Sequence, residues 1–364
     1  MALSCGIVGL PNVGKSTIFN ALTRSAQALA ANYPFATIEP NVGEVPVPDQ
    51  RLDVLGEIEK SQKIVHASMR FVDIAGLVRG ASSGAGLGNA FLSHIRETDA
   101  VAMVVRCFAD PDVAHVEGEA DPLRDIEIVN IEMALADLAT LSKRREKLER
   151  EARVNPKSLP LLEAAKRLEA ALEAGSPART FAPGSLEAGL ARESFLLSAK
   201  PMLYVANIDE MQIANPGPQA QSVFALAARE GSRAIAISGK IEAELVGLSE
   251  DDAKIFRDDL RIERSGLDAL ILNAYDLLGL MTFLTAGEKE TRAWTIAKGT
   301  KAPQAAGKIH SDIERGFIRA EIVAYEDYAR LRSMESLRAA GLLRSEGKDY
   351  VMQEGDVVNF RFNV

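Results

Sequence analysis

Residues 9–16 of this 364-residue chain read G-L-P-N-V-G-K-S and match the phosphate-binding pattern G-x-x-x-x-G-K-[ST]. They follow the apolar segment 3–8, which we expect to form a buried strand, and they precede the helix-like segment 17–22. A loop between such a strand and such a helix directs backbone N–H groups and the helix dipole toward an anion. The sequence therefore predicts a site for the phosphates of a nucleoside triphosphate.

The fixed positions of this loop have distinct physical roles. Gly14 lets the backbone turn its N–H groups inward, Lys15 places a positive charge on the β and γ oxygens, and Ser16 offers a hydroxyl to Mg²⁺. Asn12 favours the further hypothesis that a monovalent cation such as K⁺ lies beside the phosphates. The rest of the predicted nucleotide contacts in this segment come from Val13 and Thr17.

The pattern D-x-x-G, in which the aspartate helps to hold Mg²⁺ and the glycine amide senses the γ-phosphate, occurs twice. Asp73 closes a strand-like segment and opens a glycine-rich one, whereas Asp53 lies in a charged, helix-like stretch. We assign Asp73 to the metal and Gly76 to the γ-phosphate, and we interpret Asp53 as a chance match. Thr37, in a loop before another strand, is predicted to close over Mg²⁺ as a first switch.

The sequence offers more than one candidate for the group that orients the attacking water. Ras-like enzymes use a glutamine directly after the switch glycine, but here that residue is Leu77, which cannot form a hydrogen bond. Of the four histidines, His115 and His94 follow switch-like segments. We favour His115 as the catalytic group beside Lys15 and Gly76, with His94, or a cation near the loop, as the alternative.

The segment that should recognise the base departs from the GTPase pattern N-K-x-D. The chain reads N-I-D-E, so Asn207 is kept, Ile208 replaces the lysine and Glu210 replaces the aspartate. A longer acid cannot hold the paired hydrogen bonds to guanine without moving, and an apolar residue suits adenine. We expect ATP to bind at least as well as GTP. The alternative is that the longer acid, Glu210, still recognises guanine. Ser238 and Gly239 complete the predicted base site.

The order of predicted elements indicates the fold class. Strand-like segments that end at residues 9, 73, 106, 207 and 238 alternate with helical ones, as in an α/β domain with a parallel sheet. Between residues 106 and 207 lies a long helical stretch, broken at residues 155–156, which we expect to fold as a coiled-coil hairpin. Its predicted buried stripes are Ile128, Ile131, Leu135 and Leu138, then Leu161, Ala165, Leu168 and Leu172.

Short strands near residues 292–297, 317–324 and 356–363, with a helical segment near 302–315, indicate a small α+β module at the end of the chain. We therefore divide the chain into four parts. Residues 1–125 and 200–280 form the nucleotide-binding domain, residues 126–199 form the helical insertion, and residues 281–364 form the last module.

Composition excludes several classes of protein. With 47% hydrophobic and 26% charged residues, the chain is expected to be globular, and its two cysteines, Cys5 and Cys107, fit core packing in a reducing compartment. No apolar run reaches the roughly 18 residues that a membrane span needs. The net charge of −9 argues against coating of nucleic acid by bulk electrostatics. We expect a cytoplasmic protein with no membrane contact.

Longer strings resemble a known family. P-F-A-T-I-E-P-N-V-G, D-I-A-G-L-V-R-G-A and G-L-G-N-A-F-L-S-H-I-R, with R-A-W-T-I, A-P-Q-A-A-G-K-I-H and G-F-I-R-A-E near the end, resemble the YchF/Obg-like ATPases among the Obg-related P-loop GTPases. The resemblance covers nearly the whole chain. It implies a P-loop domain with a coiled-coil insertion and a C-terminal β-grasp (TGS) module.

The resemblance also implies slow hydrolysis of ATP, with GTP as a poorer substrate, and association with the ribosome and its large subunit, which would bring RNA within reach. The family's loop histidine corresponds to His115. One departure is the loop 238–240, where relatives often carry small residues. It reads S-G-K, which is closer to the S-A-K loop of GTPases and puts strict exclusion of GTP in doubt. A small-molecule phosphotransferase and a nucleotide-binding scaffold without turnover are the competing interpretations.

Overall fold

The computed structural model describes residues 3–30, 41–75, 87–109, 120–260, 262 and 264–363. The chain divides into two compact units, of which the first contains Met1–Val45 and Arg70–Ala274 and the second contains Pro46–Met69 and Tyr275–Val364. Among the described residues, none of the helices is both long and apolar enough to cross a membrane.

A six-stranded sheet in the order β2-β4-β1-β5-β6-β7 forms the centre of the first unit. Every residue of β1, β5 and β6 is buried, and the pairs from β4 through β7 are parallel. The strands are β1 (Ser4–Val8), β2 (Val42–Pro46), β4 (Ser68–Asp73), β5 (Ala100–Cys107), β6 (Met202–Ile208) and β7 (Arg233–Ile237). The predicted α/β class and its strands are confirmed, and the carboxyl ends of these parallel strands meet at one edge.

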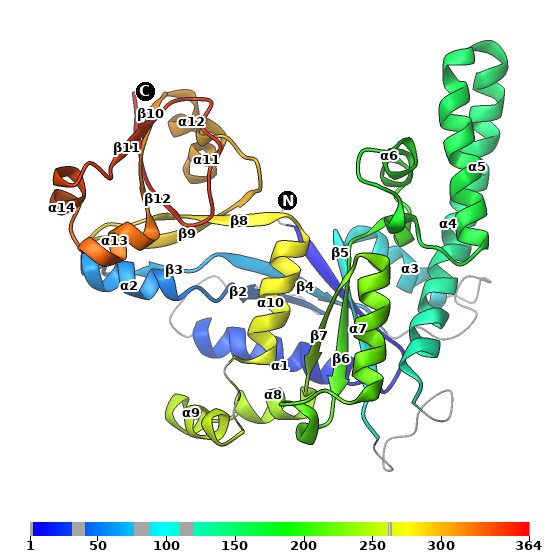
Figure 1. Ribbon diagram of the computed structural model, residues 1–364, viewed down its shortest axis with the longest axis horizontal. Coiled ribbons are helices and arrows are strands. Elements are labelled where there is room, and N and C mark those ends of the chain that lie inside the picture. Colours follow the sequence, from blue (N-terminus) through cyan, green and yellow to red (C-terminus); the bar gives the residue numbers. More distant parts are fainter. Residues whose placement is uncertain are drawn as a thin grey trace. The chain divides into compact units, whose positions relative to one another are not determined.

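Helices accompany the strands of this sheet in the order expected for an α/β domain (Figure 1). They are α1 (Lys15–Ala30), α3 (Leu87–Glu97), α7 (Pro218–Glu230), α8 (Gly239–Leu245), α9 (Glu250–Asp259) and α10 (Gly266–Leu277). Both cysteines are free and buried in strands, as predicted, and burial raises the pKa of each thiol to about 12. They act as core residues.

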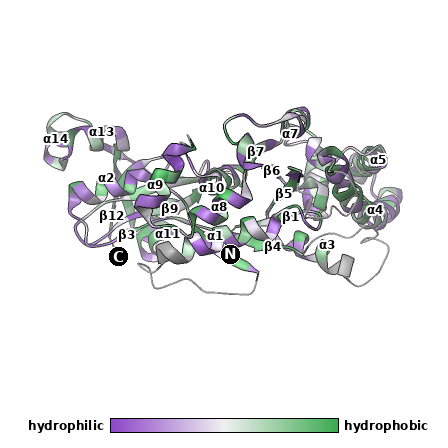
Figure 2. Cartoon of the chain, turned by 90° about the horizontal axis from the view of Figure 1, so that it is seen from below, coloured by the Kyte–Doolittle hydropathy of each residue, from purple (hydrophilic) through white to green (hydrophobic). Residues whose placement is uncertain are grey.

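The helical insertion contains α4 (Pro122–Val154), α5 (Leu159–Glu173) and α6 (Leu186–Glu193), with short 3-10 turns at Pro156–Ser158, Ala178–Thr180 and Leu197–Ala199. Helices α4 and α5 lie side by side as the predicted hairpin (Figure 1), and both carry hydrophobic and hydrophilic residues in alternation (Figure 2). Asn155 separates them and caps the turn through its side chain.

One of the two predicted buried stripes is wrong in part. Ile131 and Leu135 are each 47% exposed, although Ile128 is buried. The seam between the helices includes the predicted Leu138, which is partly buried, and continues along α4 with Leu141 and Leu148, which pack in one apolar cluster with α5. The stripe predicted on α5 holds, because Ala165, Leu168 and Leu172 are buried in that cluster.

The second unit is built on a sheet in the order β11-β10-β12-β8-β9-β3. Its strands are β3 (Ile64–Val65), β8 (Leu280–Thr285), β9 (Thr291–Ala297), β10 (Phe317–Ala324), β11 (Arg344–Glu346) and β12 (Asp356–Phe362). Its helices are α2 (Gln50–Glu59), α11 (Ala302–Ile309), α12 (Ser311–Arg315), α13 (Tyr325–Leu331) and α14 (Met334–Ala339). Phe283, Phe317 and Phe360 contribute rings to its core, and the predicted α+β character is confirmed.

Residues 46–69 differ from the division expected from the sequence. We placed them in the nucleotide-binding domain, but they group with the second unit. Strand β3 pairs in parallel with β9, and the segment's helix α2 contacts β9 and α13. Leu52 and Leu55 of α2 are fully buried, so the apolar face of this helix belongs to the second core.

Candidate nucleotide-binding site

A cavity of about 1150 Å³ lies at the carboxyl edge of the parallel sheet, within the first unit. Such an edge is where ligands bind in open α/β sheets. Most residues predicted for the site line it together: Asn12, Gly14, Lys15, Ser16, Thr17, Asp73, Asn207, Ile208, Glu210, Ser238 and Gly239. Four chain segments that are separate in sequence therefore form one site.

The phosphate loop has the backbone that its glycine requires. Gly14 has a φ of +88°, and a side-chain carbon at that position would lie 2.1 Å from Nδ2 of Asn207, so only glycine fits. Asn12 has a φ of +63°, a left-handed conformation that few residues other than glycine adopt. Helix α1 then begins at Lys15, so its free N–H groups lie at the loop.

Asn207 joins the phosphate loop to the base-binding loop. Its Nδ2 donates a hydrogen bond to the carbonyl of Val13 (2.9 Å), and its Oδ1 accepts one from the backbone N–H of Gly239 (2.9 Å). The side chain is 5% exposed, so these contacts are shielded from water. Val13 is itself buried and supplies this carbonyl. We interpret Asn207 as the residue that fixes the two loops relative to each other.

Lys15 and Asp73 form an ion pair between Nζ and Oδ1 at the floor of the cavity. Only 9% and 17% of their side-chain surfaces are exposed. The backbone N–H of Asp73 also donates to the carbonyl of Asn41 (2.8 Å), so the ends of both predicted switch segments are held at this point. A carboxylate here beside the Ser16 hydroxyl is a donor set that fits Mg²⁺ bound mainly by phosphate and water oxygens.

The other end of the cavity has the features expected for a base. Ile208 ends β6 and is 4% exposed, which provides an apolar wall. Glu210 begins the 3-10 turn Glu210–Gln212, and its Oε2 lies 2.8 Å from Nζ of Lys240. The Ser238 hydroxyl is buried and, among the described residues, has no hydrogen-bond partner. A buried polar atom of this kind indicates a ligand atom or a water at that position.

Among the other lining residues, Lys240 was not predicted for the site and His94 was predicted only as an alternative. Lys240 follows the two predicted loop residues, and its hydrogen bond with Glu210 raises the pKa of its ammonium group. The signal for it was the S-G-K loop itself, although its partner could not be read from the sequence. His94, the alternative histidine, is exposed on α3 and lines the cavity. Three predicted site residues lie outside the described residues: Thr37, Gly76 and His115.

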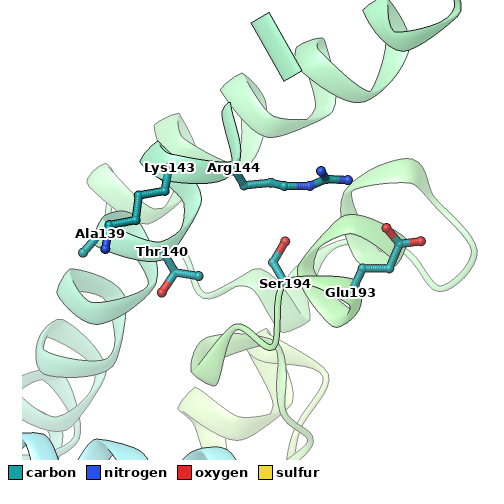
Figure 3. Close-up of a pocket in the computed structure, with 6 residues that line it drawn as sticks. All are labelled: Ala139, Thr140, Lys143, Arg144, Glu193 and Ser194. Carbon is teal, nitrogen blue, oxygen red and sulfur yellow. The ribbon is translucent and has the colours of Figure 1, made fainter. Parts of the chain in front are cut away.

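A second cavity, of about 590 Å³, lies on the helical insertion (Figure 3). Lys143 and Arg144 approach it from α4, opposite Glu193 and Ser194 at the end of α6. It has no phosphate loop. The neighbouring Arg145 forms ion pairs with two carboxylates of the hairpin, Glu149 (2.6 Å) and Glu169 (2.8 Å), as expected for a solvated helix face.

Together, the parallel sheet, the glycine-dependent loop at the start of α1, and the Lys15–Asp73 pair define a P-loop nucleoside triphosphatase of the GTPase class. Comparison with protein families agrees. Residues 4–152 match the family described as 50S ribosome-binding GTPase, and residues 280–363 match the C-terminal domain of the YchF GTPases, which is described as a protein of unknown function.

Whole-length relatives give the particular family. The chain is 50% identical to the ribosome-binding ATPase YchF of Bacillus subtilis and 46% identical to that of Escherichia coli O157:H7, over 100% of both chains in each case. The solved YchF GTPase of Schizosaccharomyces pombe is 38% identical and superimposes with a TM-score of 0.87, covering 99% of this chain and 97% of that one. The chain belongs to the YchF family.

Proposed function

We propose that this protein is a ribosome-associated ATPase that binds and slowly hydrolyses ATP, accepts GTP less well, and acts as a nucleotide-dependent switch. The residues at the base end of the cavity give the main support for this proposal. Ile208 and Glu210 stand where a GTPase has lysine and aspartate, while Asn207 keeps its place. The relatives named as ribosome-binding ATPases support both the reaction and the partner.

The residues of the cavity would have different roles in phosphoryl transfer. Lys15 would leave its contact with Asp73 to stabilise the charge that develops on the β/γ oxygens. Ser16 and Asp73, with Thr37, would hold Mg²⁺, which supplies charge neutralisation at the phosphates when it is bound. We assign the placement of the attacking water to His115, and a K⁺ site to Asn12.

The switch proposal depends on how the two loops are anchored. The hydrogen bond from Asp73 N–H to the Asn41 carbonyl joins the residue that follows the predicted first switch, which includes Thr37, to the residue that opens the predicted second switch, which includes Gly76. Contacts of Thr37 and Gly76 with a γ-phosphate would order both loops, and loss of the phosphate would release them. A partner that binds the ordered loops would therefore sense ATP.

We infer that the partner is the ribosome, through its large subunit, with RNA contacts made there. This activity would take place in the cytoplasm. The family described as 50S ribosome-binding GTPase, which residues 4–152 match, supports the large subunit in particular.

Phosphate release in the absence of any acceptor tests the enzyme. Release with ATP identifies a hydrolase, whereas release that needs an added acceptor would identify a phosphotransferase, and binding without release would identify a scaffold. Co-sedimentation with purified 50S and 30S subunits, with ATP, ADP or no nucleotide, tests the partner. We expect pelleting with 50S subunits that depends on the nucleotide.

A further inference from the structure

The ion pair between Glu210 and Lys240 lies inside the base end of the nucleotide cavity, and both residues line its wall. Their side chains are 39% and 68% exposed, so the pair contributes little to folding stability. The position of this ion pair matters more for nucleotide binding than its strength does for folding. It changes what a base would meet at the place where a GTPase reads guanine.

A GTPase presents a bare carboxylate at this place. Guanine offers N–H donors at N1 and N2, and both carboxylate oxygens accept from them. Adenine offers a lone pair at N1 and no amino group at C2, so a bare carboxylate would repel it. In this chain, Nζ of Lys240 lies 2.8 Å from Oε2 of Glu210, so one of the two acceptor oxygens is already engaged by a cation.

We propose that Lys240 is a specificity-determining residue, whose ammonium group covers the Glu210 carboxylate and presents a donor to N1 of adenine where guanine requires an acceptor. This inference rests on the proposed function, because it concerns the same nucleotide site. Adenine N1 accepts from the ammonium, whereas guanine N1–H would face another donor. The S-G-K loop, which resembles a GTPase loop in sequence, thus acts against guanine.

The negative charges of Glu244 and Asp209 reinforce the effect of Glu210, which raises the pKa of the Lys240 ammonium group. Lys240 therefore stays charged at neutral pH. It lies directly after Gly239, whose backbone is fixed by Asn207, so the start of the lysine side chain has a defined position relative to the phosphate loop.

The test measures dissociation constants for ATP and GTP in the full-length parent, Lys240→Met and Lys240→Arg. Methionine keeps the length of the side chain but removes the donor, and arginine keeps a donor. We expect Lys240→Met to bind ATP about fivefold more weakly and GTP more tightly, so that the preference changes at least tenfold. Lys240→Arg should keep the parent preference.

An ATP analogue isolates the proposed contact. In 1-deaza-ATP a C–H group replaces N1, so the parent should bind it about fivefold more weakly than ATP, while Lys240→Met should not distinguish the two. Lys166→Met is the matched control, because Lys166 pairs with Glu163 on the exposed surface of α5 with a similar exposed fraction of 50%. It should leave every constant unchanged.

Two results would overturn the inference. One is an ATP-to-GTP ratio in Lys240→Met within twofold of the parent ratio. The other is selective loss of GTP binding in that variant, which would mean that Lys240 donates to guanine O6. Failure of the proposed function looks different, since the parent would then release no phosphate from ATP without an added acceptor, whatever its ATP-to-GTP ratio.

Discussion

Lys15 and Asp73 contact each other through Nζ and Oδ1, although 58 residues separate them in the chain. The first belongs to the phosphate loop and the second ends β4. The two strands that bring them together, β1 and β4, pair in parallel with Ile7 opposite Asp73. The cation predicted to bind the phosphates and the acid predicted to bind the metal are thus positioned by the register of two adjacent strands.

Lys15→Ala should reduce turnover of ATP about a hundredfold or more, because no other loop residue supplies that charge to the β/γ oxygens. The fold should survive, since the substitution leaves the Asp73 carboxylate, 17% exposed, next to an open cavity. Phosphate release and thermal melting measure the two effects. Turnover at the parent rate would show that this loop is not the active site.

His115→Ala should slow hydrolysis about a hundredfold and leave the dissociation constant for ATP nearly unchanged, because a water-orienting group acts in the transition state. His94→Ala is the matched comparison, since His94 lines the cavity. If only the second variant loses turnover, the role belongs to His94. If neither does, replacing K⁺ by Na⁺ in the assay tests a cation held near Asn12.

Ile208→Lys combined with Glu210→Asp should move the preference toward GTP by at least tenfold, because the pair restores the guanine-reading residues of a GTPase. Equilibrium titration of ATP and GTP measures the change. The single variant Glu210→Asp separates the effect of the acid from that of the lysine. A parent protein that binds GTP tenfold more tightly than ATP would contradict the adenine assignment.

Much of this site was predictable because its parts lie at the ends of strands. Apolar runs located β1, β4 and β6, and parallel pairing brings their carboxyl ends to one edge, so the phosphate loop, Asp73 and Asn207 had to meet. The partner of Lys240 was not predictable. A side-chain pair between the 3-10 turn after β6 and the first turn of α8 depends on how the chain leaves two different strands, which the apolar pattern of the strands does not specify.

The sequence also did not predict that residues 46–69 belong to the second unit. Strand β3 has only two residues, too few for any periodicity, and its partner β9 lies more than 220 residues away. In α4 the apolar spacing also includes residues outside the part of the helix that packs on α5. Ile131 and Leu135 fit a helical stripe as well as Leu141 and Leu148 do, but only the latter pair faces α5.

Removal of the chain after Gly279 should leave ATP binding intact, because every described residue that lines the nucleotide cavity lies before it. Ribosome association should weaken. The shortened chain should also bind a hydrophobic dye, since Leu52 and Leu55 lose the β9 and α13 surfaces that bury them. Leu52→Gln with Leu55→Gln in the shortened chain should reduce that dye binding. If the shortened chain still pellets with 50S subunits as well as the parent does, the docking role belongs to a part of the chain before residue 280.

Asp137 of α4 is fully buried and holds the base of the hairpin to the chain that enters β6. Its Oδ1 accepts from the N–H of Leu197 (2.7 Å), and its Oδ2 accepts from the N–H and hydroxyl of Ser198 (2.8 and 2.6 Å). All three contacts are with donors. The carboxylate is therefore the side chain that this position requires.

Asp137→Asn should lower the free energy of unfolding by about 2 kcal/mol, because an amide NH₂ would face a backbone N–H that cannot turn away. Ser198→Ala, which removes one hydroxyl donor, should cost about 1 kcal/mol. Asp121→Asn is the control. Asp121 caps α4 by accepting from Leu123 and Arg124, and asparagine caps equally well, so its change should be small. Chemical denaturation measures all three, and equal stabilities for Asp137→Asn and Asp121→Asn would show that the buried carboxylate does not hold the hairpin.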